Sequence, residues 1–247
     1  MTHLTDLHTK ISEILNSVGF EVYPFLIGWY NDLVQEKFKL PYDRDILAFV
    51  VLSTPAMFDK AFKPFIYRQS CEGPADPIDQ CMRYYFGLIK EAFPDKEVDV
   101  IHDFEMTPTR RPKILVQTAG HVAGAAYYYQ KKDVTDEAWY PDKKMGGFSI
   151  HPKYGGWFAL RGVFIFKSIH QPDLPRIEPV DCLPSQEDRK MLLESFNFNY
   201  HDWSYRDIVV ADERYSEEQK KYFQTDPRDR KDILKEILAN CVRKEKN

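Results

Sequence analysis

The chain has 247 residues, 43% of them hydrophobic and 29% charged, which is the composition of a globular protein long enough to bury a substantial core. Its formal net charge of −4 argues against nucleic acid or an anionic membrane as a partner, because proteins that bind these polyanions carry a basic excess on one face. No apolar stretch approaches the roughly 20 residues that span a bilayer.

Hydrophobic periodicity and capping residues predict the elements in chain order. The chain is expected to begin with a helix over residues 4–15 that ends at Gly19, followed by an extended run and a short helix over 20–33. A strand over 46–54, covered on both faces, and helices over 55–62 and 77–93 are expected next. A strand over 97–106, a helix over 114–124 and a strand over 125–130 complete the first half. The second half is expected to contain strands over 147–150 and 157–166 joined as a β-hairpin, an arm without regular structure over 170–184, and helices that begin near 185, 216 and 226.

Three helix starts carry N-cap signatures. Asp76 precedes Pro77, Ser185 precedes Asp188 by three residues, and Ser216 precedes Gln219 by three residues. Strands mixed with helices, with no repeating βαβ rhythm, predict an α+β fold with a mixed or antiparallel sheet and flanking helices. We expect one domain over residues 1–247, with a helical C-terminal segment over about 216–245.

The common catalytic motifs are absent from the sequence. There is no phosphate-binding P-loop, no dinucleotide-binding glycine motif, no H-E-x-x-H zinc motif and no nucleophile elbow. Seven histidines are scattered without metal-ligand spacing. The four cysteines form no C-x-x-C pair, which favours free thiols in a reducing compartment, and the N-terminus does not resemble a signal peptide, so we expect a cytosolic protein.

The stretch 110–130 combines paired arginines, one histidine among small residues and three successive tyrosines. Small residues around His121 would let the backbone and the imidazole approach something large and flat. A buried histidine with satisfied hydrogen bonds at a tightly packed junction is the alternative. A second dense stretch, 146–162, is glycine-rich and is interpreted as its partner.

Two arginines lie in apolar surroundings where a guanidinium needs an anionic partner. Arg161 is flanked by apolar residues of an expected strand, and Arg206 lies among aromatic residues. An anionic small molecule and an internal salt bridge are both compatible with this setting; the candidate internal partners are Asp202, Asp207 and Glu105.

Several long strings in the right order resemble one known family. They are VLSTPAMFD, RRPKIL, QTAGHVAGAAYYYQ, IHPKYGGWFALRGV, FNFNYHDWSYRD and ERYSEEQKKYF. The chain resembles the cobalamin-processing chaperones of the CblC type, the family of methylmalonic aciduria and homocystinuria type C, from about Phe20 to Arg230. The resemblance implies a flavin-nitroreductase-like α+β fold in a single cytoplasmic cobalamin-processing domain.

The resemblance also implies the chemistry. Members bind cobalamin with its dimethylbenzimidazole tail off cobalt and remove the upper ligand, by glutathione-dependent dealkylation of alkylcobalamins and by flavin-dependent (FMN or FAD) reductive decyanation of cyanocobalamin. They deliver cobalamin onward to downstream trafficking and methionine synthase-pathway proteins, as a monomer or a ligand-dependent homodimer. The cofactor supplies the reactivity, and the protein supplies geometry and electrostatics.

The resemblance also implies site residues, at the positions of this chain that match the family's motifs. The cobalamin-binding residues are His121, Tyr128, Gln130, Gly155, Gly156, Trp157, Leu160 and Tyr215, and the glutathione-binding residues are Arg161, Arg206 and Arg230. No protein nucleophile and no protein metal ligand are implied, because the substrate thiolate attacks. Position 149 is Ser149, where some relatives carry cysteine, and the proline- and serine-rich tail of some relatives is absent. A non-catalytic cobalamin carrier and a flavin-only reductase remain the alternatives.

Overall fold

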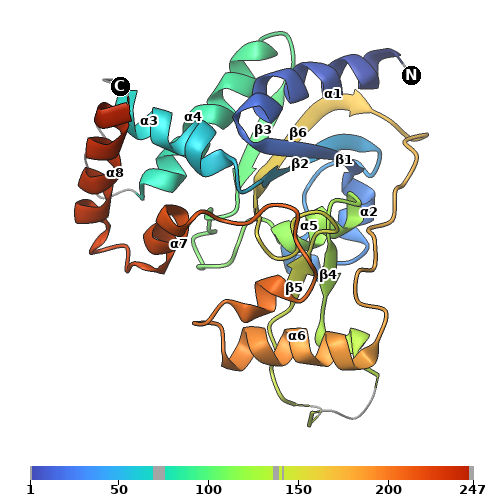
Figure 1. Cartoon of the computed structure of the whole chain (residues 1–247). Coiled ribbons are helices and arrows are strands. Elements are labelled where there is room, and N and C mark those ends of the chain that lie inside the picture. The colour runs from blue at the N-terminus through green and yellow to red at the C-terminus, as the bar shows by residue number, and fades with distance from the viewer. Residues whose placement is uncertain (1, 69–75, 136–138, 141, 245–247) are drawn as a thin grey trace. The chain divides into compact units, whose positions relative to one another are not determined.

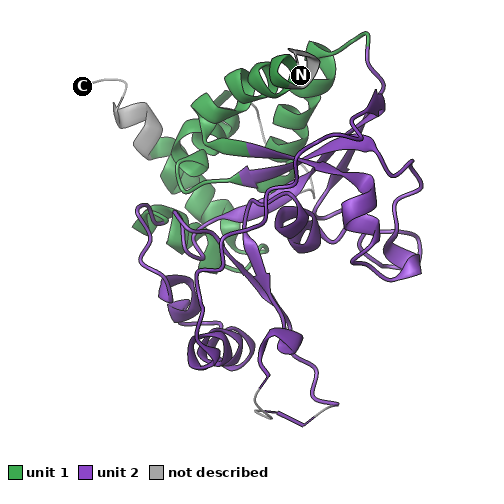
Figure 2. Ribbon diagram, turned by 90° about the vertical axis from the view of Figure 1, so that its right-hand side faces the viewer, with its two compact units in different colours: residues 1–21, 53–95, 215–247 green, residues 22–52, 96–214 purple. Residues whose placement is uncertain are grey.

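The computed structural model describes residues 2–68, 76–135, 139–140 and 142–244, and the chain divides into two compact units (Figure 2). Unit 1 comprises residues 1–21, 53–95 and 215–247, and unit 2 comprises residues 22–52 and 96–214. Within the described ranges, no helix is long and apolar enough to cross a membrane. The single cobalamin-processing domain expected over residues 1–247 stays a prediction.

Unit 1 is built mainly from helices (Figure 1). They are α1 (Thr2–Leu15), η1 (Asn16–Val18), η3 (Phe58–Phe62), α3 (Lys63–Arg68), α4 (Pro77–Ala92), α7 (Glu217–Gln224) and α8 (Arg230–Lys244). Two predicted N-caps are confirmed, because the Asp76 side chain accepts the backbone N–H of Ile78 at 2.8 Å and the Ser216 hydroxyl accepts that of Gln219 at 3.2 Å. Gly19 ends the first helical segment with a φ of 86°, in the left-handed region.

Two helices of unit 1 differ from the prediction by more than two residues at an end. The helix expected from residue 55 contains a π-helical turn, η3, before α3 begins. The last helix begins at Arg230 and not at 226, because Asp226 accepts the backbone N–H of Arg228 at 2.9 Å and holds a separate turn ahead of it.

A four-stranded sheet lies almost entirely in unit 2. Its strands are β1 (Phe20–Leu26), β2 (Ile46–Ser53), β3 (Val98–His102) and β6 (Ala159–His170), in the order β1-β2-β6-β3. The predicted burial of the apolar strand is confirmed, since every residue of β2 is buried. β3 runs antiparallel to β6, with His102 opposite Gly162, which brings the end of β3 beside Arg161.

A second, two-stranded antiparallel sheet pairs β4 (Tyr127–Tyr129) with β5 (Phe148–Ile150). Helix α6 (Gln186–Phe198) and η5 (Ser204–Asp207) pack on this sheet, and the rings of Phe148 and Phe196 lie 4.9 Å apart (Figure 1). The predicted N-cap of α6 is confirmed, because the Ser185 hydroxyl accepts the backbone N–H of Asp188 at 3.1 Å.

The predicted β-hairpin between the strands near 147–150 and 157–166 is wrong. β5 pairs with β4, whereas β6 pairs with β2 and β3 in the other sheet. Only the connecting turn folds back on itself, through reciprocal backbone hydrogen bonds of 2.9 Å between His151 and Gly155. Gly156 then donates its backbone N–H to the Arg206 carbonyl at 2.9 Å, so the chain leaves β5 before the next strand begins.

Helices α2 (Ile27–Asn31), η2 (Glu36–Phe38), α5 (Val116–Val122) and η4 (Lys131–Asp133) complete unit 2. α5 packs closely on β6, because a Cβ on Gly120 would lie 2.8 Å from the Leu160 side chain. The irregular arm predicted over 170–184 is confirmed from residue 171 onwards, where the described residues contain no helix or strand, whereas His170 ends β6. The α+β class is confirmed.

The described cysteine side chains are free thiols. Cys81 is buried and Cys182 is half-buried. Burial raises the pKa of the Cys182 thiol, and the neighbouring Asp181 carboxylate raises it further. Cys71 and the side chain of Cys241 lie outside the described part of the chain.

Candidate functional site

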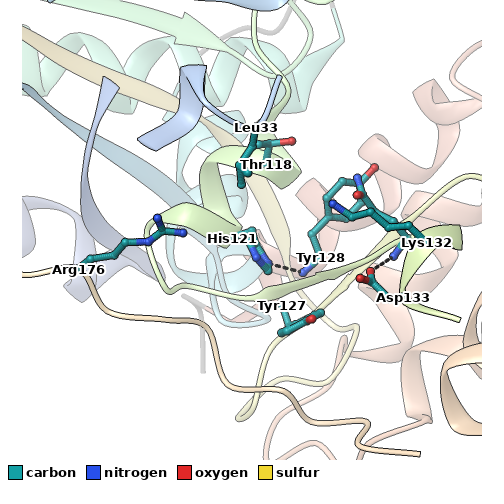
Figure 3. Close-up of a pocket in the computed structure, with 9 residues that line it drawn as sticks. Leu33, Thr118, His121, Tyr127, Tyr128, Lys132, Asp133 and Arg176 are labelled. Carbon is teal, nitrogen blue, oxygen red and sulfur yellow. Dashed lines mark hydrogen bonds between the residues drawn. The ribbon is translucent and has the colours of Figure 1, made fainter. Parts of the chain in front are cut away.

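A pocket of about 230 Å³ lies between α5, β4 and η4 in unit 2 (Figure 3). Its lining residues are Leu33, Thr118, His121, Tyr127, Tyr128, Gln130, Lys132, Asp133 and Arg176. Three of the residues that the family resemblance assigned to cobalamin, His121, Tyr128 and Gln130, therefore meet at one cavity. Small-molecule sites usually measure roughly 300 Å³ or more, so this pocket is smaller than a typical one.

His121 is held in one orientation by its neighbours. Its Nδ1 accepts the backbone N–H of Tyr128 at 3.1 Å, and its ring meets the Tyr127 ring edge-on at 4.9 Å between centroids (Figure 3). Burial lowers the pKa of His121 below its ordinary value, against the opposing effect of the Glu178 and Asp133 carboxylates. The imidazole is therefore neutral at pH 7, and its proton lies on Nε2 because Nδ1 is an acceptor.

The other two predicted residues of this wall are also fixed by local contacts. Gly147 leaves room for the Tyr128 ring, since a Cβ there would lie 2.6 Å from it. Gln130 and Asp133 form a capping box at η4, in which the Asp133 carboxylate accepts the Gln130 backbone N–H at 2.7 Å.

Sequence reasoning missed the charged residues of the pocket. Arg176 comes from the irregular segment 171–184 and points towards His121 across the cavity (Figure 3). Its Nε lies 2.9 Å from the Glu178 carboxylate, and its guanidinium lies 5.8 Å from the centre of the Trp29 ring. Lys132 could have been predicted as a pocket residue, because it lies two residues after Gln130 in the sequence. Arg176 carries no local signal, because its arm has no periodicity to show which side chains face inwards.

The predicted glycines at 155 and 156 are packed against protein backbone. Gly155 has a φ of 54°, and a Cβ there would lie 2.9 Å from the Arg206 carbonyl oxygen. A Cβ on Gly156 would lie 2.7 Å from Arg206 Cα. The chain therefore requires glycine at both positions to admit the η5 backbone.

The next two predicted residues are buried. Trp157 is 3% exposed and donates from its indole N–H to Asp207 at 2.6 Å. Leu160 is 7% exposed and packs on Gly120. In this structure both side chains fill the interior, and their assignment to cobalamin stays a prediction.

Arg206 lies in an aromatic cage. Its guanidinium donates to the Gly156 carbonyl and lies 4.8 Å from the Trp203 ring and 5.4 Å from the Tyr205 ring, with Phe148 and Trp157 slightly farther away. Trp203 has a φ of 61°, a strained value for a residue with a side chain. The cage links the Gly155–Trp157 turn to η5.

Arg161 is 9% exposed in β6. Its backbone carbonyl accepts the N–H of Asp103 at 3.1 Å, which places the Asp103 carboxyl next to this arginine. Burial raises the pKa of Asp103, and the positive charge of Arg161 counteracts part of that rise. The nearby Glu105 has other partners, the amine of Lys113 at 2.7 Å and His102 Nδ1 at 2.9 Å, and its pKa is lowered to about 2.

The remaining two predicted residues lie in unit 1. Arg230 donates to the Asp76 carboxylate at 2.6 Å and to the Thr225 carbonyl at 3.1 Å. Tyr215 is 6% exposed, with its ring 5.6 Å from that of Phe223. The structure thus brings Arg161 and Arg206 into one unit and Arg230 and Tyr215 into the other.

The small residues around His121 have internal neighbours. Ala119, Ala123, Ala125 and Ala126 are buried in one hydrophobic cluster. A Cβ on Gly124 would lie 2.5 Å from the Ile177 carbonyl oxygen. Internal packing therefore accounts for their size, and none of these small residues is among those that line the cavity. Among the described residues, no three His, Cys, Asp or Glu side chains are grouped to hold a metal ion.

The geometry defines an α+β protein with a polar pocket beside a short second sheet, and solved structures of the same architecture exist. A crystal structure titled as a C. elegans B12-trafficking protein CblC, a human MMACHC homologue, superposes with a TM-score of 0.88 at 35% identity, covering 97% of this chain and 98% of that one. The predicted nitroreductase-like fold is thereby confirmed.

Sequence comparison gives the same result. The model of the methylmalonic aciduria and homocystinuria type C family matches residues 19–234, and the chain belongs to this family. Proteins named cyanocobalamin reductase / alkylcobalamin dealkylase are 55% identical in Gallus gallus, over 91% of this chain and 94% of the relative, and 51% identical in Homo sapiens, over 94% and 82%.

Proposed function

We propose that this protein is a cyanocobalamin reductase and alkylcobalamin dealkylase. The observation that carries the proposal is the 55% identity to a relative of that name over 91% of this chain. We further propose that it binds cobalamin with the dimethylbenzimidazole tail off cobalt and passes the processed cobalamin onward in the cytoplasm. The His121 pocket supports this assignment, because it can take one arm of a large ligand.

Dealkylation is proposed to use the thiolate of glutathione. Its sulfur forms a bond to the alkyl carbon while the cobalt–carbon bond breaks and leaves both electrons on cobalt, so that cobalt is reduced and a thioether is released. The protein needs no nucleophile of its own. Its contribution is to hold sulfur and carbon in line, which accelerates such transfers strongly.

Decyanation of cyanocobalamin is proposed to need a flavin, FMN or FAD. When bound, the reduced flavin supplies electrons to cobalt, and the upper ligand leaves as cyanide. The hydrogen-bond donors of the His121 pocket suit the phosphate of a flavin nucleotide, although the cavity is too small for a whole one. Neither reaction requires a protein metal ligand.

Arg161, Arg206 and Arg230 are proposed to bind the carboxylates of glutathione, because guanidinium groups pair bidentately with carboxylates. Each has internal contacts that a bound tripeptide would share or replace: Asp103 beside Arg161, the aromatic cage around Arg206, and Asp76 beside Arg230. Arg161 is the most informative of the three, since it is buried beside a carboxyl, that of Asp103, whose pKa is raised by burial.

The test of the activity starts with methylcobalamin and its visible spectrum. Binding should produce the spectrum of the tail-detached form, and anaerobic addition of glutathione should yield S-methylglutathione. No spectral change on mixing would refute the proposal. Cobalamin binding without S-methylglutathione or decyanation would identify a carrier, and retained flavin without affinity for cobalamin would identify a flavin-only reductase.

Arg161→Gln tests the glutathione assignment. We expect glutathione-dependent dealkylation to fall by about tenfold to a hundredfold, the effect of one lost charge-assisted contact, while cobalamin affinity changes little. The matched control is Arg44→Gln, which removes a solvent-exposed arginine paired with Asp32 in the same unit and should leave both quantities unchanged. Equal losses of dealkylation and cobalamin binding would contradict the assigned role.

A further inference from the structure

Several side-chain acceptor atoms in the wall of the His121 pocket accept hydrogen bonds from backbone N–H groups of the same wall. His121 Nδ1 accepts the Tyr128 N–H at 3.1 Å, and Asp133 Oδ2 accepts the Gln130 N–H at 2.7 Å. The Gln130 side chain also accepts a backbone N–H, from Asp133, in the capping box. His121 Nδ1 is therefore unavailable to a ligand, and one acceptor position each on Gln130 and Asp133 is taken.

The donors come from three elements around the cavity. His121, at the end of α5, presents Nε2–H because its other nitrogen is occupied. Lys132 in η4 lines the cavity, and its positive charge acts on His121. Arg176 retains its terminal nitrogens, since its contact with Glu178 is through Nε.

The two carboxylates near the cavity are already engaged. Asp133 receives a backbone N–H, and Glu178 balances Arg176. The charges close to His121 are thus two cations, Lys132 and Arg176, and two carboxylates, each with a donor of its own. A group that brings acceptor atoms can be answered here by His121 Nε2–H, by the Lys132 ammonium and by the terminal nitrogens of Arg176.

We propose that the pocket is a phosphate-binding subsite, in which His121 Nε2–H and the Lys132 ammonium donate hydrogen bonds to phosphate oxygens of a ligand. Ionised phosphate oxygens are acceptors, and charge-assisted hydrogen bonds to them are strong. This inference rests on the proposed function, which supplies two ligands that carry a phosphate: cobalamin, with the phosphodiester of its nucleotide tail, and FMN, with a phosphate monoester.

The same geometry means that His121 cannot bind cobalt through Nε2 in its present tautomer. A lone pair on Nε2 would require the proton to move to Nδ1, which would break the bond from Tyr128. His121 is therefore assigned to recognition of the ligand periphery.

The test compares ligands with and without the phosphate. Affinities of the full chain are measured for cobalamin and cobinamide, which lacks the nucleotide tail, and for FMN and riboflavin. His121→Asn keeps an acceptor near the Nδ1 position for Tyr128 but removes the Nε2 donor, and Lys132→Met removes the ammonium. We expect each to weaken the phosphate-bearing ligand about tenfold and to leave its phosphate-free counterpart unchanged.

The outcome identifies the source of the phosphate. A loss confined to cobalamin assigns the pocket to the nucleotide tail, and a loss confined to FMN assigns it to the flavin. Equal effects on ligands with and without phosphate, in both pairs, would overturn the inference. Lys132→Met keeps the test decisive if His121→Asn folds poorly, because Lys132 is solvent-exposed.

Two controls separate this inference from the proposed function. Lys60→Met removes an exposed lysine of unit 1 and should change none of the four affinities. If the unmodified chain binds neither cobalamin nor cobinamide, the proposed function fails. If it binds both, and the His121 and Lys132 variants do not discriminate between them or between the two flavins, only the phosphate subsite fails.

Discussion

The His121 pocket wall and the Gly155–Trp157 turn received the same assignment from the family resemblance, but they are built differently. In the pocket wall, backbone N–H groups occupy acceptor atoms and leave donors facing a cavity. In the turn, the glycines admit the Arg206 backbone, and Trp157 is buried against Asp207. The first region faces a cavity and the second is packed against the protein itself. Residues that one resemblance groups together therefore need not have one physical role.

The largest expected effect comes from a substitution that disrupts the Gly155–Trp157 turn. Gly156→Ala would place a methyl group 2.7 Å from Arg206 Cα and 3.0 Å from the Phe148 ring. Backbone cannot yield as a flexible side chain does, so we expect a loss of about 3 kcal/mol in the free energy of unfolding. Chemical denaturation measures it.

Gly87→Ala is the matched control for that substitution. Gly87 lies inside α4, and a Cβ there meets nothing within 4 Å. Alanine should stabilise the helix by about 0.5–1 kcal/mol. If both alanine variants behaved alike, the close approach of the turn to η5 would be contradicted.

The next effect concerns Arg206, which joins the turn to its aromatic cage. Arg206→Met removes the hydrogen bond to the Gly156 carbonyl and the contacts with Trp203 and Tyr205. We expect a loss of about 2 kcal/mol in stability, and about half of that for Arg206→Lys, which keeps the charge. Unchanged stability together with lost use of glutathione would show that Arg206 serves only the ligand.

Local signals in the sequence were sufficient for many elements. The caps at Asp76, Ser185 and Ser216 and the buried strand β2 are each determined by a few adjacent residues. Strand pairing is not local: β5 and β6 have similar apolar character, and nothing within either strand specifies that they join different sheets. This is why the predicted hairpin was wrong.

The candidate site divides in the same way. Motif resemblance located His121, Tyr128 and Gln130, which do share a pocket. It could not reveal Arg176, which reaches the pocket from an irregular arm far away in sequence. It also could not distinguish glycines required by a ligand from glycines required by neighbouring backbone, because the sequence shows glycine in both cases.

A smaller expected effect is the pH dependence of stability that His121 contributes in the pocket wall. The pKa of folded His121 lies below its ordinary value of 6.5, so the unfolded chain binds more protons between those two values. Stability supplied by the neutral imidazole is complete above 6.5 and declines as the pH falls through this interval. Denaturation midpoints of the native chain should therefore drop on acidification more than those of His121→Gln. Parallel curves for the two proteins would contradict the buried neutral state.

The smallest effect is a gain in stability, and it distinguishes packing from binding in the sheet that carries Tyr128. Ser149 is 5% exposed and lies opposite Tyr128 in the β4–β5 register, so both side chains share one face. Its hydroxyl has no hydrogen-bond partner among the described residues. Ser149→Ala removes an unsatisfied polar group and should raise stability by about 0.5 kcal/mol. If cobalamin affinity falls at the same time, the hydroxyl serves the ligand; if affinity is unchanged, this strand belongs, like the turn that follows it, to the protein interior.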